Sequence, residues 1–387
     1  MKNNFKLLIA AVALLAIGCS KNNPHLDHAL QMKEKIYKLY DVDETPLLAE
    51  NYPQDVAAEA TYLAEGADNK VNKYSYLWPY SGTLSMMSAL YEATGDDSIL
   101  EFIDEEIIAG LKMYHDTSRE PYGYSSYITA DKSDRFYDDN IWLGIDFTDL
   151  YLLTGNKEYL AKAEEIWKFI ESGIDNRLDG GIYWCEQKKQ SKNACSNAPG
   201  AVFAAKLYLA TDNQDYLDMA KGLYQWTKQS LLDESDWLYK DNMNLRREVD
   251  GRKFAYNSGQ MVQAGALLYR ITGRMEYIEE ARRTAKACHE FFFRPFTGKD
   301  GKEFRILKKD NVWFHAVMVR GLVELYHMDG NAEYVNDVRK TLEHAWQEAR
   351  TSQGLFPTDL SGEREDKKFW LLTQAAMAEM FARMSGV

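Results

Sequence analysis

Apolar and polar positions along the chain divide it into two kinds of helical segment. In the first kind, apolar residues occupy nearly every side, as in 141–153, 201–209 and 261–271. A helix that is apolar all round must be buried all round. In the second kind, as in 157–171, apolar residues share one face and charged residues cover the other. The pattern therefore predicts inner helices enclosed by amphipathic outer helices.

A short motif joins the two kinds of segment and recurs along the chain. Its copies begin at Tyr91, Tyr151, Tyr208, Tyr269 and Tyr326, with spacings of 60, 57, 61 and 57 residues. A fixed period of this kind marks a repeated supersecondary unit. Four copies carry a glycine where a helix ends in the left-handed conformation, namely Gly95, Gly155, Gly273 and Gly330. The asparagines that can start the outer helix are Asn156, Asn213 and Asn331.

Counting these units predicts an all-α protein with six inner and six outer helices, an (α/α)6 barrel. We expect inner helices at 79–94, 138–154, 197–210, 257–272, 313–328 and 367–384. We expect outer helices at 97–115, 157–172, 214–231, 275–293 and 332–350, with N-terminal helices near 27–40 and 54–65 in the sixth outer position. An open α-solenoid is the alternative, but it would need capping repeats. Because the chain ends on an inner helix, closure by the N-terminal helix is favoured.

The connections before the inner helices are much longer than those after them. The long ones are 116–137, 173–196, 232–256, 294–312 and 351–366. Loops of this length in a compact domain are usually functional, and parallel inner helices place them on one face. Many aromatic residues lie on these loops and at the adjoining helix starts. Aromatic planes combined with Asp and Asn suit a sugar chain, because ring faces stack and hydroxyls hydrogen-bond.

Composition narrows the class of ligand. The net charge of −13 argues against nucleic-acid binding, since phosphates need cationic partners. Aromatic residues make up 13% of the chain, which agrees with a neutral ligand such as a carbohydrate. No Cys and His residues have the spacing of a metal site, and no glycine-rich phosphate loop occurs, so we expect no metal and no cofactor. We expect a monomer.

The N-terminus reads as a targeting segment. Lys2 and Lys6 precede an apolar run, 7–17, that ends shortly before Cys19. A basic start followed by a short apolar run and small residues is typical of a secretory signal. The end of this run resembles a bacterial lipoprotein box, which implies lipidation of Cys19. We therefore predict a signal peptide at 1–18, a tether at 19–26 and one catalytic domain at 27–387. The predicted location is the outer membrane of a Gram-negative bacterium, on its periplasmic or cell-surface face.

Two adjacent acids, Asp138 and Asp139, stand at the start of the second inner helix. Helix capping is the simpler interpretation, since Asp is a preferred cap. Glycoside hydrolysis, however, needs one ionised and one protonated carboxyl group, and repulsion between neighbours raises one pKa. Neighbouring residues can hold carboxyls about 5 Å apart, as in a retaining enzyme. Other acids on this face could serve instead, although each reads more simply as a solvated loop acid: Asp131, Asp134 and Asp359.

Four motifs resemble glycoside hydrolase family 76, the endo-α-1,6-mannanases of bacteria and fungi. They are Tyr137-Asp138-Asp139-Asn140-Ile141-Trp142, Gly180-Gly181-Ile182-Tyr183-Trp184, Asn193 with Asn197, and Tyr256-Asn257-Ser258-Gly259. The resemblance covers nearly the whole chain after the tether. It implies an (α/α)6 barrel that degrades mannan by endo cleavage of α-1,6-mannosidic bonds. It also implies that Asp138 is the nucleophile and Asp139 the acid/base of a retaining mechanism.

The aromatic rim and the motif residues together supply the candidate contacts to an α-mannan polysaccharide or oligosaccharide. These candidates are Tyr80, Tyr137, Asn140, Tyr183, Trp184, Asn193, Asn197, Tyr256, Asn257, Trp313 and His315. At 257–260 and 314–316 the chain departs from the family pattern, which puts substrate preference in doubt more than reaction type. His315 is equally compatible with a sugar contact and with a structural role.

Two other functions stay open at this point. Another enzyme of the same fold, an unsaturated-glycoside hydrolase or a sugar epimerase, would require His or Arg constellations at the barrel centre. A non-catalytic surface glycan-binding protein is the second alternative, and the retention of both aspartates speaks against it. In an oxidising compartment Cys185 and Cys195 could form a disulfide, although their spacing alone does not show it.

Overall fold

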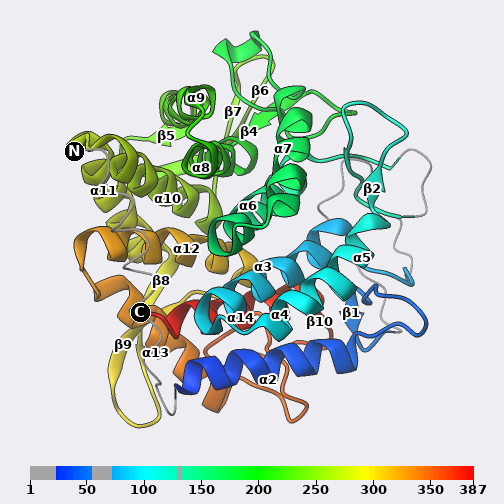
Figure 1. Cartoon of the computed structure of the whole chain (residues 1–387). Helices are drawn as coiled ribbons and strands as arrows, with labels where there is room; N and C mark the ends of the chain where they lie inside the picture. The colour runs from blue at the N-terminus through cyan, green and yellow to red at the C-terminus, as the bar shows by residue number, and fades with distance from the viewer. Residues whose placement is uncertain (1–22, 55–71, 129–132) are drawn as a thin grey trace.

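A computed structural model describes residues 23–54, 72–128 and 133–387. The predicted signal peptide, the first half of the tether with Cys19, nearly all of the predicted helix 54–65 and Asp131 lie outside these residues. Six inner helices occur within them: α3 (Leu77–Thr94), α6 (Tyr137–Thr154), α8 (Ala194–Thr211), α10 (Ala255–Thr272), α12 (Val312–Asp329) and α14 (Leu371–Met384). Each packs against the next, and α14 packs against α3 (Figure 1). The ring is closed, which confirms the (α/α)6 barrel and excludes the open solenoid.

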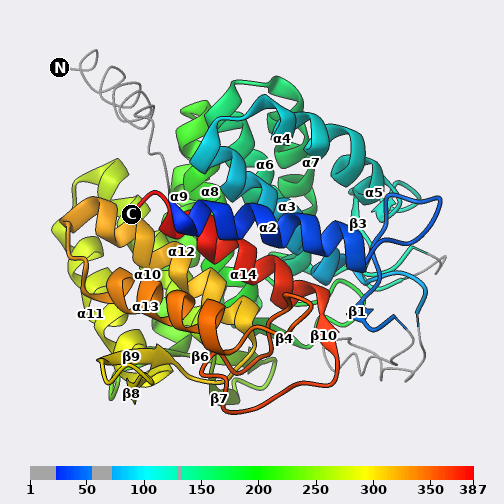
Figure 2. The same ribbon diagram turned by 90° about the horizontal axis from the view of Figure 1, so that it is seen from below.

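Amphipathic helices surround this ring as predicted. They are α2 (Pro24–Leu39), α7 (Lys157–Glu171), α9 (Gln214–Leu231), α11 (Met275–Phe292) and α13 (Glu333–Glu348). The segment predicted as one helix at 97–115 has a π-helical turn, η1 (Ile103–Ile107), between α4 (Asp97–Phe102) and α5 (Ile108–Lys112). Helix α2 packs along α14, as Figure 2 shows, so the N-terminal helix covers the last inner helix.

The turns from inner to outer helices follow the predicted chemistry. Four inner helices end on a left-handed glycine at the predicted positions, Gly95, Gly155, Gly273 and Gly330. The turn after α8 has no glycine, and Asp212 adopts the left-handed conformation there, with φ of 57°. Asn156 and Asn213 cap α7 and α9 by accepting a hydrogen bond from the amide two residues later, at 3.0 and 3.1 Å. Asn331 does the same from one position before the cap of α13.

The long connections contain short antiparallel strands where the sequence predicted only loops. Strand β6 (Leu238–Asn244) pairs with β4 (Ser191–Asn193), β5 (Leu232–Asp233) and β7 (Val249–Lys253). The other pairs are β1 (Asn51–Tyr52) with β10 (Phe369–Trp370), β2 (His115–Asp116) with β3 (Gly123–Tyr124), and β8 (Phe293–Thr297) with β9 (Glu303–Leu307). Strands β6 to β9 lie along one edge of the molecule in Figure 2. No helix in the described part of the chain combines the length and apolarity that membrane crossing requires.

The fourth residue of each inner helix is a buried polar side chain that fastens the connection entering that helix. In three helices this side chain is an amide, which bonds both the N–H and the C=O of a single residue in that connection. Asn140 accepts from the Tyr124 amide at 2.7 Å and donates to the Tyr124 carbonyl at 3.0 Å. Asn197 pairs in the same way with Ile182, and Gln374 pairs with Phe356. These three amide groups are thus bonded to the backbone through both their oxygen and their nitrogen.

The other three inner helices use a different side chain at the same position. The hydroxyl of Tyr80 donates to the Pro46 carbonyl at 2.9 Å, and Ser258 accepts from the Tyr239 amide at 3.0 Å. His315 Nε2 hydrogen-bonds the Lys308 carbonyl at 2.8 Å. Four residues predicted as sugar contacts occupy these loop-fastening positions, where their side chains are buried and bonded to the backbone: Tyr80, Asn140, Asn197 and His315.

Candidate active site

A cavity of about 620 Å³ lies where the first turns of the inner helices meet the strands of the entering connections. A volume of this size is typical of ligand-binding clefts. Its walls come from segments far apart in the chain, with these lining residues: Glu50, Asn51, Trp78, Trp184, Ser191, Asn193, Cys195, Asp241, Asn242, Arg252, Phe254, Tyr256, Asn311, Phe314, Lys368 and Trp370. The predicted gathering of aromatic and amide side chains on one face therefore occurs.

One wall of the cleft is a row of aromatic rings. Tyr256 and Phe314 stack in parallel, with ring centres 4.1 Å apart and planes inclined by 4°. Trp78 lies beyond Phe314 at 6.2 Å, and Trp370 meets Trp78 edge-on at 5.3 Å. A continuous apolar surface of this kind is what the ring faces of a sugar chain pack against.

Asp138 and Asp139 occupy the first turn of α6 beside this cleft. Phe136 is the N-cap, so neither aspartate holds the cap position that the simpler interpretation required. Their exposed fractions are 9% and 8%. Neither carboxyl is part of the cleft wall itself; the pair adjoins the cleft through Trp184, which lines it and whose indole Nε1 donates to Asp138 Oδ2 at 3.2 Å.

Burial raises the pKa of both carboxyl groups. It raises the pKa of Asp138 to about 7, and the shift is moderated by the Cys195 thiol, the amides of the first helical turn and the Trp184 indole. The thiol and the amides act from nearby without a well-formed hydrogen bond, since Oδ1 of Asp138 has no partner that satisfies hydrogen-bond geometry. Burial together with the charge of Asp138 raises the pKa of Asp139 well above its ordinary value. The donors act on Asp138 and the repulsion acts on Asp139, so these surroundings favour the negative charge on Asp138.

Two more acids line the cleft and were missed by the sequence analysis. Asp241, on β6, accepts hydrogen bonds from Asn242 at 3.0 Å and from Arg252 at 3.3 Å, and burial raises its pKa. Glu50 accepts from the Trp370 indole at 2.7 Å and from a backbone amide at 2.8 Å. Neither acid sits in a sequence motif, and only strand pairing brings them to the cleft.

Comparison with known proteins decides the family. The profile of glycosyl hydrolase family 76 matches residues 32–299. The chain belongs to glycoside hydrolase family 76. The family 76 glycoside hydrolase (mannosidase) of Bacteroides thetaiotaomicron VPI-5482 is 32% identical, with a TM-score of 0.85 over 94% of this chain and 98% of that one.

A second solved structure is an inactive variant of the α-1,6-mannanase of Salegentibacter sp. HEL1_6 in complex with α-1,6-mannotriose, with two consecutive aspartates changed to asparagine. It is 24% identical, with a TM-score of 0.75 over 93% of this chain and 99% of that one, and so shows the shared fold. The mannan endo-1,6-α-mannosidase of Candida glabrata is 32% identical over 146 residues, 33% of this chain and 32% of that protein. The chain spans about half or less of the length of the curated relatives it matches.

Of the sugar contacts predicted for this family 76 protein, three line the cleft: Trp184, Asn193 and Tyr256. Four more, besides the loop-fastening residues, point elsewhere. Tyr137 stacks on Phe169 at 4.8 Å, and the Tyr183 hydroxyl donates to Asp175 at 2.9 Å. Both rings are buried in packing, and neither lines the cleft.

Trp313 and Asn257 are the other two predicted contacts outside the cleft lining. Trp313 is fully buried inside the barrel, with the Arg320 guanidinium 5.0 Å from its ring centre. Asn257 is fully buried near Asp241 and does not line the cleft. Trp313 thus faces the barrel interior, whereas Asn257 lies behind an acid of the cleft wall.

The cysteines of this region are reduced. Cys185 and Cys195 are buried free thiols, so the possible disulfide between them is not formed. No cluster of three or more His, Cys, Asp or Glu side chains suited to a metal ion occurs in the residues that the structure describes.

Proposed function

We propose that the protein is a retaining, endo-acting glycoside hydrolase that cleaves α-1,6-mannosidic bonds in the backbone of mannan. The observation that carries this proposal is the pair of adjacent buried carboxyl groups, both with a raised pKa, beside a cleft with an aromatic wall. A retaining glycosidase needs one carboxylate as nucleophile and one carboxylic acid as proton donor.

The reaction runs in two steps on this chain's residues. Ionised Asp138 attacks the anomeric carbon of the bound mannosyl unit while Asp139 gives its proton to the departing glycosidic oxygen. Asp139, now ionised, then takes a proton from a water that displaces Asp138 from the sugar. The second inversion restores the starting configuration and returns both aspartates to their initial protonation states. The hydrogen bond from Trp184 to Asp138 Oδ2 favours the ionised form that attacks.

Family membership and the relatives support the choice of substrate. The Salegentibacter protein is described as an α-1,6-mannanase, and the Candida glabrata protein as a mannan endo-1,6-α-mannosidase. The stacked rings of Tyr256 and Phe314 give the cleft a surface for successive mannose rings, and Asn193 and Asn242 add polar groups for hydroxyls.

The two alternatives receive less support. An unsaturated-glycoside hydrolase or epimerase needs a free His or Arg at the barrel centre. Arg320, which lies there, is held by Glu379 with contacts of 2.6 and 2.8 Å, and His315 is bound to the backbone. A non-catalytic glycan-binding protein would have no use for two buried carboxyl groups whose ionisation is costly.

Purified protein incubated with linear α-1,6-mannan tests the proposal. We expect a ladder of oligosaccharides at early times, as endo cleavage requires, and products that first appear as the α-anomer by proton NMR. Release of mannose alone would contradict endo action, and first appearance of the β-anomer would contradict retention. Binding to mannan without any cleavage would instead support the glycan-binding alternative, and cleavage of unsaturated uronides but not mannan would support the other enzyme class.

The protein is anchored by lipid on Cys19 in the outer membrane of a Gram-negative bacterium. The basic start, the apolar run 7–17 and the cysteine at its end support this part of the proposal. Mass spectrometry of the N-terminal peptide should find a diacylglyceryl group on Cys19, and the Cys19→Ser variant should move from the membrane to the soluble fraction. An unmodified Cys19 in membrane-associated protein would overturn it.

A further inference from the structure

The hydrogen bond from Trp184 is the one side-chain contact of good geometry made to the aspartate pair by the described residues. Its donor fixes where Oδ2 of Asp138 can lie and stabilises the carboxylate against protonation. Trp184 itself belongs to an irregular segment between β-bridges, without a helix to hold it. Something else must therefore keep the indole in place.

A short antiparallel ladder ties this segment to the start of α6. The Tyr137 amide donates to the Trp184 carbonyl at 2.9 Å, and the Glu186 amide donates to the Arg135 carbonyl at 3.0 Å. Between these bonds Phe136 pairs with Cys185, and the Phe136 ring packs on the Trp184 ring at 4.9 Å. The ladder therefore holds residues 135–137 against residues 184–186. The two aspartates come directly after the first segment, and the indole of Trp184 belongs to the second.

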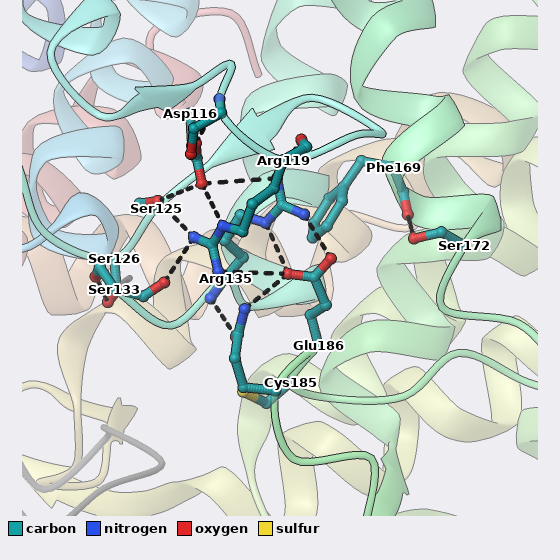
Figure 3. Close-up of polar contacts among 12 residues, drawn as sticks. Asp116, Arg119, Ser125, Ser126, Ser133, Arg135, Phe169, Ser172, Cys185 and Glu186 are labelled. Atoms are coloured by element: carbon teal, nitrogen blue, oxygen red, sulfur yellow. Dashed lines mark hydrogen bonds and ion pairs between the residues drawn. The ribbon is translucent and has the colours of Figure 1, made fainter. Parts of the chain in front are cut away.

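The far end of the ladder is closed by an ion pair between the buried Arg135 and the partly buried Glu186, which Figure 3 shows. Arg135 is fully buried, and its Nε and Nη2 bind the two oxygens of Glu186 at 2.7 and 2.5 Å. Its Nη1 donates to the carbonyls of Arg119 and Pro121, each at 3.1 Å. Two-pronged contact of this kind fixes the orientation of both groups.

Further groups complete the environment of this pair. The guanidinium of Arg135 lies 4.8 Å from the ring centre of Phe169 on α7. Asp116 binds Arg119 at 2.6 Å and stands 3.9 Å from Arg135 Nη1, so two acids and two arginines balance in charge. Figure 3 shows these side chains converging from the β2–β3 region, the approach to α6 and the Trp184 segment.

A buried ion pair is a poor way to gain stability, because desolvation of the charges offsets most of their attraction. It is a good way to fix geometry. We propose that Arg135 and Glu186 are positioning residues that hold the Trp184 indole on Asp138 and thereby keep the nucleophile ionised. This inference rests on the proposed function of the aspartate pair.

Loosening the pair should act on Asp138 through Trp184. We expect Glu186→Gln to move the acidic limb of the kcat/KM profile on α-1,6-mannan upward by about one pH unit, because the carboxylate loses a stabilising donor. KM should change little, since neither Arg135 nor Glu186 lines the cleft. Arg135→Lys keeps the positive charge but loses the two-pronged contact with Glu186. It should give a smaller shift of the acidic limb in the same direction.

The matched control is Glu280→Gln. Glu280 pairs with Lys228 between outer helices α9 and α11, and its side chain is 20% exposed against 22% for Glu186. Loss of this pair lowers the thermal midpoint as a structural effect but leaves the pH profile unmoved. None of these variants substitutes the other titratable groups that face Asp138, which are Asp139, Cys185, Cys195 and Tyr256.

A double-mutant cycle decides whether the effect passes through the indole. Trp184→Phe removes the donor directly and should produce a shift at least as large as that of Glu186→Gln. Adding Glu186→Gln to Trp184→Phe should then add little, because no donor is left to position. Full additivity of the two shifts, or a profile of Glu186→Gln that matches Glu280→Gln, would overturn the inference.

A measurement without substrate separates this inference from the proposed function. The fluorescence difference between wild type and Trp184→Phe reports the titration of Asp138, because a carboxyl group beside an indole alters its emission. The midpoint of this difference should rise when Glu186→Gln is placed in both proteins. If wild type cleaves no mannan, the proposed function fails while this titration still tests the positioning role.

Discussion

Helix α6 carries buried aspartates at two levels, and the two levels differ in what surrounds them. Asp138 and Asp139 lie in the first turn, beside the cleft. Asp146 lies seven residues further, where Ser85 donates to its Oδ2 at 2.5 Å. Burial raises the pKa of both Asp138 and Asp146 to about 7. A raised pKa thus accompanies burial at either level, and it does not by itself identify the catalytic group.

The two levels differ in their access to solvent and in whether their charges are paired. Asp146 is fully enclosed, and the nearby Arg320 opposes the effect of burial on its pKa. Arg320 is itself bound by Glu379, which also binds Arg383 at 2.7 Å. The interior charges are matched and closed off by packing. At the first turn two carboxyl groups share a site without a counter-charge, and the cleft supplies the solvent and substrate that chemistry needs.

The largest expected effect is on activity at the first turn. Asp138→Asn should lower kcat on α-1,6-mannan by roughly 10⁴-fold, a loss of the order seen for single catalytic residues. Asp146→Asn should leave kcat within about tenfold of wild type. Initial rates of reducing-sugar release measure both, with circular dichroism to verify folding. Equal losses in the two variants would mean that the interior level takes part in catalysis.

The interior level should dominate stability instead. Glu379→Gln removes the counter-charge of two arginines, and we expect the free energy of unfolding to fall by about 3–5 kcal/mol. Urea unfolding followed by fluorescence measures this loss. As a control, Arg246→Gln breaks an ion pair whose side chains are 80% and 61% exposed and should change the unfolding midpoint little. A Glu379→Gln protein as stable as wild type would show that the interior charges are not balanced by this contact.

The raised pKa values of the aspartates at both levels should make the stability of the protein depend on pH. A carboxyl group with a raised pKa binds its proton more tightly in the folded chain, so its stabilising contribution is complete below the unfolded pKa of about 3.9. That contribution is lost as pH rises toward about 7, the folded pKa of Asp146. The melting temperature should therefore fall from pH 4.5 to pH 7.5, and Asp146→Asn should flatten this fall. An unchanged slope would show that Asp146 titrates at its ordinary pKa.

The smallest expected effect concerns the loop-fastening residue in the same turn as the aspartates. Asn140→Ala leaves the buried backbone groups of Tyr124 unpaired, which should cost about 1–3 kcal/mol of unfolding free energy. Asn193→Ala, at the cleft, should raise KM for mannan and leave stability nearly unchanged. Thermal unfolding and steady-state kinetics of both variants measure the contrast. A raised KM without destabilisation in Asn140→Ala would return Asn140 to the sugar contacts.

The sequence by itself determined the architecture of this protein. Periodicity of apolar residues, the recurring turn motif and the glycines at helix ends are local features, and each acts within one helix–turn–helix unit. Repetition of the unit fixed the number of inner helices and the side on which the long connections gather. The adjacent aspartates needed no tertiary information to be noticed, because they stand together at a helix start.

Only the tertiary structure decided which polar residues at that face meet the cleft. Asn193 and Asn197 lie one helical turn apart, yet the first lines the cleft and the second fastens a loop. Glu50 joins the site through Trp370, 320 positions away, and Asp241 through pairing of β6. The direction of such a side chain depends on how distant segments pack and on strand register. Neither of these is encoded in the local pattern that reveals the helices.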